Sequence, residues 1–306
     1  MYDVIIIGAG PAGMTAGLYC IRTELKTLVI ESQMPGGQIA TAEKIDNYPG
    51  FPNGITGMEL AVKIEEQAKN AGVTINTLES VENIKKMKEE FLVLTSEGEY
   101  KSRSIIISSG LRNRRLNIPG EDEFFGRGVS YCATCDGPLF KDKRVAIIGS
   151  GTGAVKAALF MEGIASEVSI ILNGEKVKVA EPIIGTRLDR SNISLLKRTK
   201  VGEIIGDQVV NGLRVMDLMN KNEYEIKVDG VFIEVGKDPN TAFLSGLGLE
   251  MDERGYIAVD SQQRTNIKGF FAAGDVTSEG IKQVTITVAH GCKAALSAYE
   301  YLKGES

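Results

Sequence analysis

One short pattern occurs twice in this 306-residue chain, and it constrains the fold more than any other feature. Residues 3–13 read DVIIIGAGPAG, and residues 144–154 read RVAIIGSGTGA. Each copy is a continuous apolar strand that runs into a glycine-rich turn and then into a helix with apolar periodicity. This is the opening of a βαβ nucleotide-binding unit, whose buried parallel strand is apolar throughout. Two copies predict an α/β protein with two Rossmann-like dinucleotide-binding domains.

The first unit ends its second strand on an acidic residue. Gly8, Gly10 and Gly13 form the turn, and the strand-like segment KTLVIE closes on Glu31. A carboxylate roughly 20 residues beyond such a turn is placed to accept the ribose hydroxyls of an adenosine. The first unit therefore predicts a complete dinucleotide site.

The second unit lacks such a residue. Its turn supplies Gly149, Gly151 and, in the third position, Ala154. An NAD site usually ends the second strand with Asp or Glu, and an NADP site places arginines just beyond it. Here Asn173 and Gly174 follow the strand, and then Lys176 and Lys178. The lysines either replace those arginines or belong to a solvated turn.

A pair of cysteines lies just before the second unit, in SYCATCDGPLF at residues 130–140. Such a pair serves as half a zinc site, a structural disulfide, a thiol switch or a dithiol that turns over. The other cysteines, Cys20 and Cys292, are isolated, and His290 is the only histidine. We therefore expect no metal site, because structural zinc usually takes four Cys or His ligands. The single histidine also disfavours a Ser-His-Asp or Cys-His hydrolase.

Charge and hydropathy exclude two further classes. The net charge of −5 argues against a nucleic-acid partner, which would require a basic surface. No apolar run approaches the ~20 residues that span a membrane. Strand-like sequence begins at Val4, so we expect no signal peptide and a cytoplasmic protein without a membrane partner.

The end of the chain predicts one more helix. FFAAGD at 270–275 follows the strand-like segment GYIAVD at 255–260, and apolar residues then recur at helical spacing over 283–302. Cys20 and Cys292 fall on apolar stripes, which favours packed core thiols. His290 falls off the stripe, which favours partial exposure.

Six motifs occur in an order that resembles one family. They are GAGPAG at 8–13, PGGQ at 35–38, NYPGF at 47–51, CATCD at 132–136, GSGTGA at 149–154 and AAGD at 272–275. Together they resemble the low-molecular-weight thioredoxin reductases, over essentially the whole chain. These are flavoproteins with two dinucleotide-binding domains.

The resemblance implies a discontinuous FAD domain, residues 1–112 and 242–306. An inserted NAD(P)-type domain, residues 113–241, would carry the CxxC motif. The residues it places along FAD are Gly8, Gly10, Pro11, Ala12, Gly13, Glu31, Gly36, Gly37, Gln38, Asn47, Gly274, Asp275, Lys282, Gln283 and Val284. Those it places at a nicotinamide dinucleotide are Gly149, Gly151 and Ala154. Asp275 would bond the ribityl chain, with turn capping as its alternative role.

The resemblance also implies catalytic roles for Cys132, Cys135 and Asp136. Cys135 would meet the flavin ring, and Cys132 would attack the disulfide of a thioredoxin or glutaredoxin-like partner. Asp136 would be the general acid/base, with a helix N-cap or turn aspartate as its alternative role. A homodimer is implied, with the two domains rotating about linkers near 111–117 and 236–240.

The chain differs from NADPH-dependent members of the family at the residues that would recognise the electron donor. NADPH-dependent members carry an HRR-type run where this chain has Ile171-Leu172-Asn173-Gly174. Three interpretations stay open: NADPH bound through lysines, NADH, or a donor such as ferredoxin that is not a nicotinamide. Two other functions remain to be tested: an oxidase or ferredoxin–NADP reductase on the same scaffold, and a flavin-based redox sensor.

Overall fold

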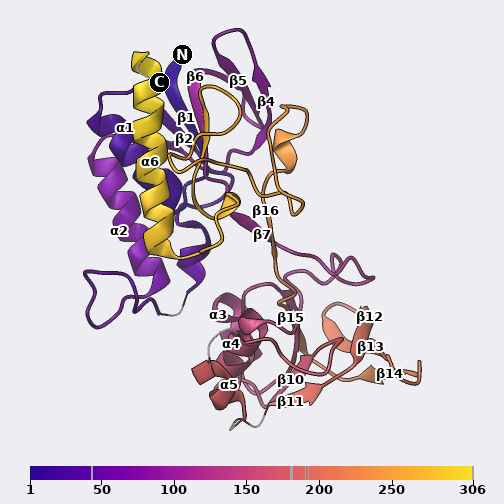
Figure 1. Ribbon diagram of the computed structural model, residues 1–306. Coiled ribbons are helices and arrows are strands. Elements are labelled where there is room, and N and C mark those ends of the chain that lie inside the picture. Colours follow the sequence, from indigo (N-terminus) through magenta and orange to yellow (C-terminus); the bar gives the residue numbers. More distant parts are fainter. Residues whose placement is uncertain (43, 180–181, 190, 192, 305–306) are drawn as a thin grey trace. The chain divides into compact units, whose positions relative to one another are not determined.

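The computed structural model describes residues 1–42, 44–179, 182–189, 191 and 193–304. The chain forms two compact units (Figure 1). One contains Met1–Arg112 and Asp238–Ser306, and the other contains Asn113–Lys237. The predicted second boundary, at residue 242, lies a few residues beyond this division. Which cofactor each unit binds stays a prediction.

The first unit is built on a seven-stranded sheet in the order β3-β2-β1-β6-β5-β4, with β17 also paired to β6. The strands are β1 (Tyr2–Ile7), β2 (Thr27–Ile30), β3 (Thr74–Asn76), β4 (Val81–Lys86), β5 (Phe91–Thr95), β6 (Glu99–Ile107) and β17 (Phe270–Ala272). β1 runs parallel to β2 and β6, with Ile5 opposite Leu28 and Ile105. β4 and β5 extend the sheet with antiparallel pairing.

Both faces of β1 are buried, which explains its continuous apolar sequence. Val4 and Ile6 pack in one cluster with the helices Pro11–Arg22 and Val284–Lys303, while Ile5 and Ile7 pack in a second cluster on the other face. The helices of this unit are α1 (Pro11–Arg22), α2 (Gly57–Asn70) and α6 (Val284–Lys303), with 3-10 turns η1 (Gly37–Thr41), η3 (Ala242–Leu244) and η4 (Gly274–Val276). Figure 1 shows the three helices grouped on one side of this sheet.

The second unit repeats the order of strand, turn, helix and strand. β9 (Arg144–Ile148), α4 (Thr152–Met161) and β10 (Glu167–Ile171) form this repeat. The parallel sheet has the order β11-β10-β9-β15-β8, and an antiparallel sheet has the order β12-β13-β14. The remaining elements are β8 (Val129–Ser130), α3 (Ala133–Asp136), η2 (Gly137–Phe140), α5 (Pro182–Asp189), β11 (Ser194–Leu196), β12 (Thr199–Gly206), β13 (Val210–Asp217), β14 (Glu223–Ile226) and β15 (Gly230–Ile233).

Two short strands carry the chain between the units. β7 (Leu111–Asn113) and β16 (Lys237–Pro239) pair as a two-stranded ribbon. The α/β class with two Rossmann-like units is confirmed. No helix in the described ranges is long and apolar enough to cross a bilayer.

Two expectations about the end of the chain were wrong. Residues 255–260 form no strand, and Ile257 makes only isolated bridges to Met251 and Thr277. His290 is buried, with 4% of its surface exposed, and its Nε2 lies 2.8 Å from Oε2 of Glu279. Helical periodicity could not reveal this burial, because Glu279 belongs to the loop that precedes α6. Cys20 is a buried core thiol, as expected, whereas Cys292 is half-buried.

Candidate functional site

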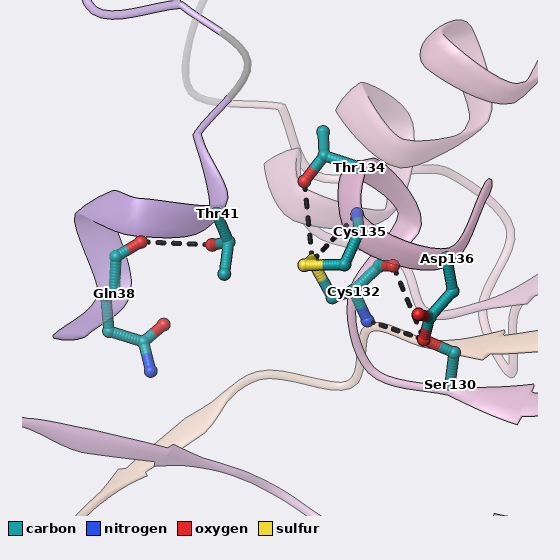
Figure 2. Close-up of a disulfide and its surroundings, with 7 residues drawn as sticks. All are labelled: Gln38, Thr41, Ser130, Cys132, Thr134, Cys135 and Asp136. Atoms are coloured by element: carbon teal, nitrogen blue, oxygen red, sulfur yellow. Dashed lines mark hydrogen bonds between the residues drawn. A yellow bond between two sulfur atoms is a disulfide. The ribbon is translucent and has the colours of Figure 1, made fainter. Parts of the chain in front are cut away.

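The CxxC pair forms a disulfide at the start of a helical turn (Figure 2). Cys132 and Cys135 have Cα atoms 5.3 Å apart, and Cys132 is the N-cap residue of α3. The Cys135 N–H donates to Sγ of Cys132 at 3.2 Å, and the Thr134 hydroxyl lies 3.4 Å from the same sulfur. Donors of this kind favour a thiolate once the disulfide is reduced. These contacts therefore favour a thiolate at Cys132.

Asp136 is held by a serine that the sequence did not single out. Ser130 is buried, and its hydroxyl donates to Oδ2 of Asp136 at 2.6 Å. The Ser130 hydroxyl oxygen in turn accepts the Cys132 N–H at 3.0 Å. Asp136 lies at the last position of α3 and, at the N-cap position of η2, makes no side-chain capping bond. Ser130 thus links the backbone of the first cysteine to the carboxylate that follows the second (Figure 2).

Replacing Ser130 with alanine is expected to lower the rate of disulfide reduction about ten-fold, because the Asp136 carboxylate loses its fixed orientation. The rate of thiol release from a protein disulfide measures this effect. Ser130→Thr is the matched control, since it keeps the hydroxyl and should retain most of the rate. An alanine variant as fast as the parent protein would show that Asp136 needs no such positioning.

The first glycine turn packs so closely against neighbouring backbone that side chains are excluded from it at Gly8 and Gly13. Gly8 has φ +107°, and a Cβ placed on it would lie 2.4 Å from the Ser108 carbonyl oxygen. A Cβ on Gly13 would lie 1.8 Å from the Gly8 carbonyl oxygen, so α1 can pack onto β1 only with glycine there. Pro11 opens α1, and its N-cap, Gly10, offers no side-chain bond. The first N–H groups of α1 are therefore left for an anion such as a pyrophosphate.

Two further segments meet this turn. The Gly36 N–H donates to the Ala9 carbonyl at 2.9 Å, and a Cβ on Gly37 would lie 3.2 Å from Cα of Gly10. Glu31 accepts the Ala9 N–H through Oε2 at 2.7 Å. Its carboxylate therefore lies beside the first glycine turn, as its position at the end of the second strand predicted. These residues fit the phosphate and ribose of a dinucleotide.

The remaining predicted flavin residues come from distant parts of the chain. Asn47 donates to Oε1 of Gln283 at 3.1 Å, and Asp275 accepts the Thr287 hydroxyl at 3.2 Å. Gln38 donates to the Leu111 carbonyl at 3.1 Å. A Cβ on Gly274 would lie 2.9 Å from Cβ of Ala12, which places this loop against the start of α1. Ala12 is buried at that contact.

The start of α6 is open at its N-terminus. Gln283 is the N-cap without a side-chain bond, and Val284 is the first helical residue. The Lys282 ammonium donates to the carbonyls of Thr277 and Glu279, at 2.7 Å in each case. Burial lowers the pKa of Lys282, and the Asp275, Asp252 and Glu279 carboxylates oppose this effect. The described residues thus supply positive charge where the resemblance places the flavin.

The second glycine turn opens into a pocket of about 860 Å³ within the second unit. Gly149 and Gly151 line it, and so do Lys176 and Lys178. The Lys178 N–H donates to the Ser150 carbonyl at 2.5 Å, which draws this segment over the turn. Both lysines thus line the pocket, and both are exposed to solvent.

Ala154, a predicted contact of the nicotinamide dinucleotide, does not line this pocket. It is fully buried, and a Cβ on Gly149 would lie 3.0 Å from the Ala154 Cβ. Its small side chain permits α4 to pack closely on β9. Sequence reasoning missed the pocket residues Lys200, Glu234 and Lys237. Glu234 follows β15, so the usual position of ligand residues beyond a parallel strand was the available signal.

Known proteins match the whole chain. The family described as pyridine nucleotide-disulphide oxidoreductase matches residues 2–291. Thioredoxin reductase of Aquifex aeolicus is 39% identical, covering 100% of this chain and 94% of its own length. The crystal structure of Lactococcus lactis thioredoxin reductase has a TM-score of 0.91 and 38% identity, covering 99% of this chain and 100% of that one.

A ferredoxin-flavin thioredoxin reductase from Clostridium acetobutylicum is also similar. It has a TM-score of 0.55 and 34% identity, covering 99% of this chain and 98% of that one. The glycine turns and the CxxC disulfide described above are thus accompanied by full-length similarity. The chain belongs to the pyridine nucleotide-disulphide oxidoreductase family, among the low-molecular-weight thioredoxin reductases.

Proposed function

We propose that this protein is an FAD-dependent reductase of the disulfide of a thioredoxin or glutaredoxin-like protein. The observation that carries the proposal is the Cys132–Cys135 disulfide, with hydrogen-bond donors at one sulfur and Asp136 held by Ser130. A structural disulfide needs no such donors and no adjacent carboxylate. The arrangement suits a dithiol that is oxidised and reduced repeatedly.

The cysteines perform two exchanges in each cycle. FAD bound in the first unit, once reduced by the electron donor, would supply the electron pair that opens the disulfide, and two protons would complete the dithiol. The Cys132 thiolate then attacks one sulfur of the partner disulfide and forms a mixed disulfide. Cys135 attacks Cys132, which restores the intramolecular disulfide and releases the partner as a dithiol. Asp136 gives or takes the proton at each thiol.

The first unit supplies the flavin site in this proposal. Its open α1 N-terminus, the glycine turn and Glu31 suit the pyrophosphate and the adenosine ribose. The resemblance further supports a homodimer and a cytoplasmic location, where reducing conditions keep such dithiols in use.

The electron donor is the part of the proposal that most needs a test. The lysine-lined pocket suits the phosphates of NADPH or NADH, whereas the similar clostridial protein is described as ferredoxin-linked. The protein is titrated anaerobically with NADPH, NADH and reduced ferredoxin, each in a separate experiment. Only the true donor should bleach the visible absorbance of the flavin. We expect a nicotinamide to bleach it at near-stoichiometric concentration.

Steady-state reduction of a thioredoxin, driven by the donor found in this way, tests the function itself. A redox sensor would show negligible turnover with every thioredoxin tried. An oxidase would consume the donor with oxygen and leave the protein disulfide intact. Either result would contradict the proposed function.

A further inference from the structure

The pocket of the second unit contains a carboxylate close to the place that suits a pyrophosphate. Glu234 follows β15, and its N–H donates to the Ile148 carbonyl at 2.8 Å, so it lies beside the end of β9. A Cβ on Gly153, in the first turn of α4, would lie 3.0 Å from Oε2 of Glu234. The carboxylate therefore lies against the helix end that offers N–H groups to an anion.

The charges around this carboxylate have the opposite sign. Four lysines line the same pocket: Lys176 and Lys178 after β10, Lys200 on β12 and Lys237 at the start of β16. Glu234 is the only acidic residue in the lining, as far as the described residues show. The first turn of α4 and the turn after β9 contribute glycines, Ser150 and Thr152 but no titratable side chain. The pocket thus attracts phosphate from several sides and repels it from one.

We propose that Glu234 sets the dinucleotide affinity of this pocket, acting as a negative charge that weakens the binding of nicotinamide dinucleotides. An ionised carboxylate near a bound pyrophosphate is a like-charge contact within a partly dehydrated site, where such repulsion is strong. The inference rests on the proposed function, in which this pocket receives a nicotinamide donor.

The protonation of Glu234 gives the inference a second, independent signature. Burial raises the pKa of Glu234, and the Lys237 ammonium partly offsets this. Below that pKa the carboxyl group is neutral and the repulsion disappears. Dinucleotide affinity should therefore rise as the pH falls through the pKa of Glu234.

The test measures binding of NAD⁺ and NADP⁺ to the flavin-containing protein by isothermal titration calorimetry. Neither oxidised dinucleotide can reduce the enzyme, so the measurement needs no turnover. At about pH 8, Glu234→Gln should bind both about ten-fold more tightly than the parent, which corresponds to 1.4 kcal/mol. Glu234→Asp, which keeps the charge, should resemble the parent. Glu234→Ala should bind both dinucleotides as tightly as Glu234→Gln does. This result would show that the gain in affinity comes from the loss of the charge and not from a hydrogen bond of the new amide.

The pH dependence of binding is measured with NAD⁺, because the 2′-phosphate of NADP⁺ would itself change its charge over the pH range of the experiment. As the pH falls from about 8 through the raised pKa of Glu234, the advantage of Glu234→Gln should shrink toward zero. Glu167→Gln is the matched charge control, since Glu167 is exposed at the start of β10, the opposite end of the parallel sheet. This control should leave the affinity unchanged.

An affinity that Glu234→Gln leaves unchanged or weakens would overturn the inference, and so would undetectable binding by both proteins at millimolar dinucleotide. The two proposals fail separately. Thioredoxin reduction by the parent protein with an unaltered affinity in Glu234→Gln refutes only the role of Glu234. Tighter binding by the variant, without thioredoxin reduction by any donor, refutes only the proposed function.

Discussion

Replacing Cys135 with serine should lower the rate of thioredoxin reduction on the order of 10³-fold or more, because no second sulfur remains to resolve the mixed disulfide. Cys132 should still attack the partner and remain bonded to it. Two measurements check this: steady-state thiol release, and the covalent complex with thioredoxin on a non-reducing gel. The flavin absorbance should be retained, since Cys135 belongs to the second unit, whereas the glycine turn that suits the flavin pyrophosphate belongs to the first.

Cys292→Ser is the control for the loss of a cysteine. Cys292 is half-buried on α6 and hydrogen-bonds with Tyr19, which raises the pKa of that tyrosine. Because Cys292 takes no part in the proposed thiol–disulfide exchange, its serine variant should keep the parent rate. More than a tenth of the parent rate in Cys135→Ser would mean that electrons reach the partner by another route.

Alanine substitutions at two glycines of the first turn should affect different properties: one the stability of the fold, the other the binding of FAD. A Cβ on Gly13 would lie 1.8 Å from the Gly8 carbonyl oxygen and 2.6 Å from the Ser108 hydroxyl, so α1 must move away from β1. We expect Gly13→Ala to lower the free energy of unfolding by about 3 kcal/mol. Thermal unfolding followed by circular dichroism measures the loss.

Gly10→Ala is the matched variant. Gly10 has φ −77°, which alanine adopts freely, and its Cβ would find only Cα of Gly37, at 4.0 Å. The polypeptide should therefore fold, while the new methyl group blocks the backbone approach that a pyrophosphate needs. We expect the purified Gly10→Ala protein to lose most of its FAD, as measured by flavin absorbance per protein. Full flavin content in this variant would place the pyrophosphate elsewhere.

Much of the site could be predicted because its signals are local in the chain. The two glycine turns, Glu31 after the first unit and the CxxC pair each lie within a short stretch, where strand and helix period determine the neighbours. The structure brings Glu31 to within 2.7 Å of the first turn and joins Cys132 to Cys135. These contacts connect residues whose separation the βαβ unit or a single helical turn prescribes.

The contacts that the sequence did not reveal connect residues with no fixed spacing. Ser130 belongs to a two-residue strand, and only the path of the following turn brings its hydroxyl to Asp136. His290 is buried because the loop that carries Glu279 folds back onto α6. Ala154 matched a binding motif, yet it lies in the core because helix packing requires a small side chain there.

By itself, the sequence determined the α/β class, the two nucleotide-type units and the redox pair, because strand period, turn geometry and cysteine spacing are properties of adjacent residues. Only the tertiary structure decided the character of the second pocket. Lys176 and Lys178 follow β10 and Glu234 follows β15, and these segments meet because parallel strands end at one edge of a sheet. Lys200 on β12 and Lys237 on β16 reach the same pocket from outside that sheet. Charge in a pocket is a sum over residues that are distant in the chain, so no single motif could have predicted it.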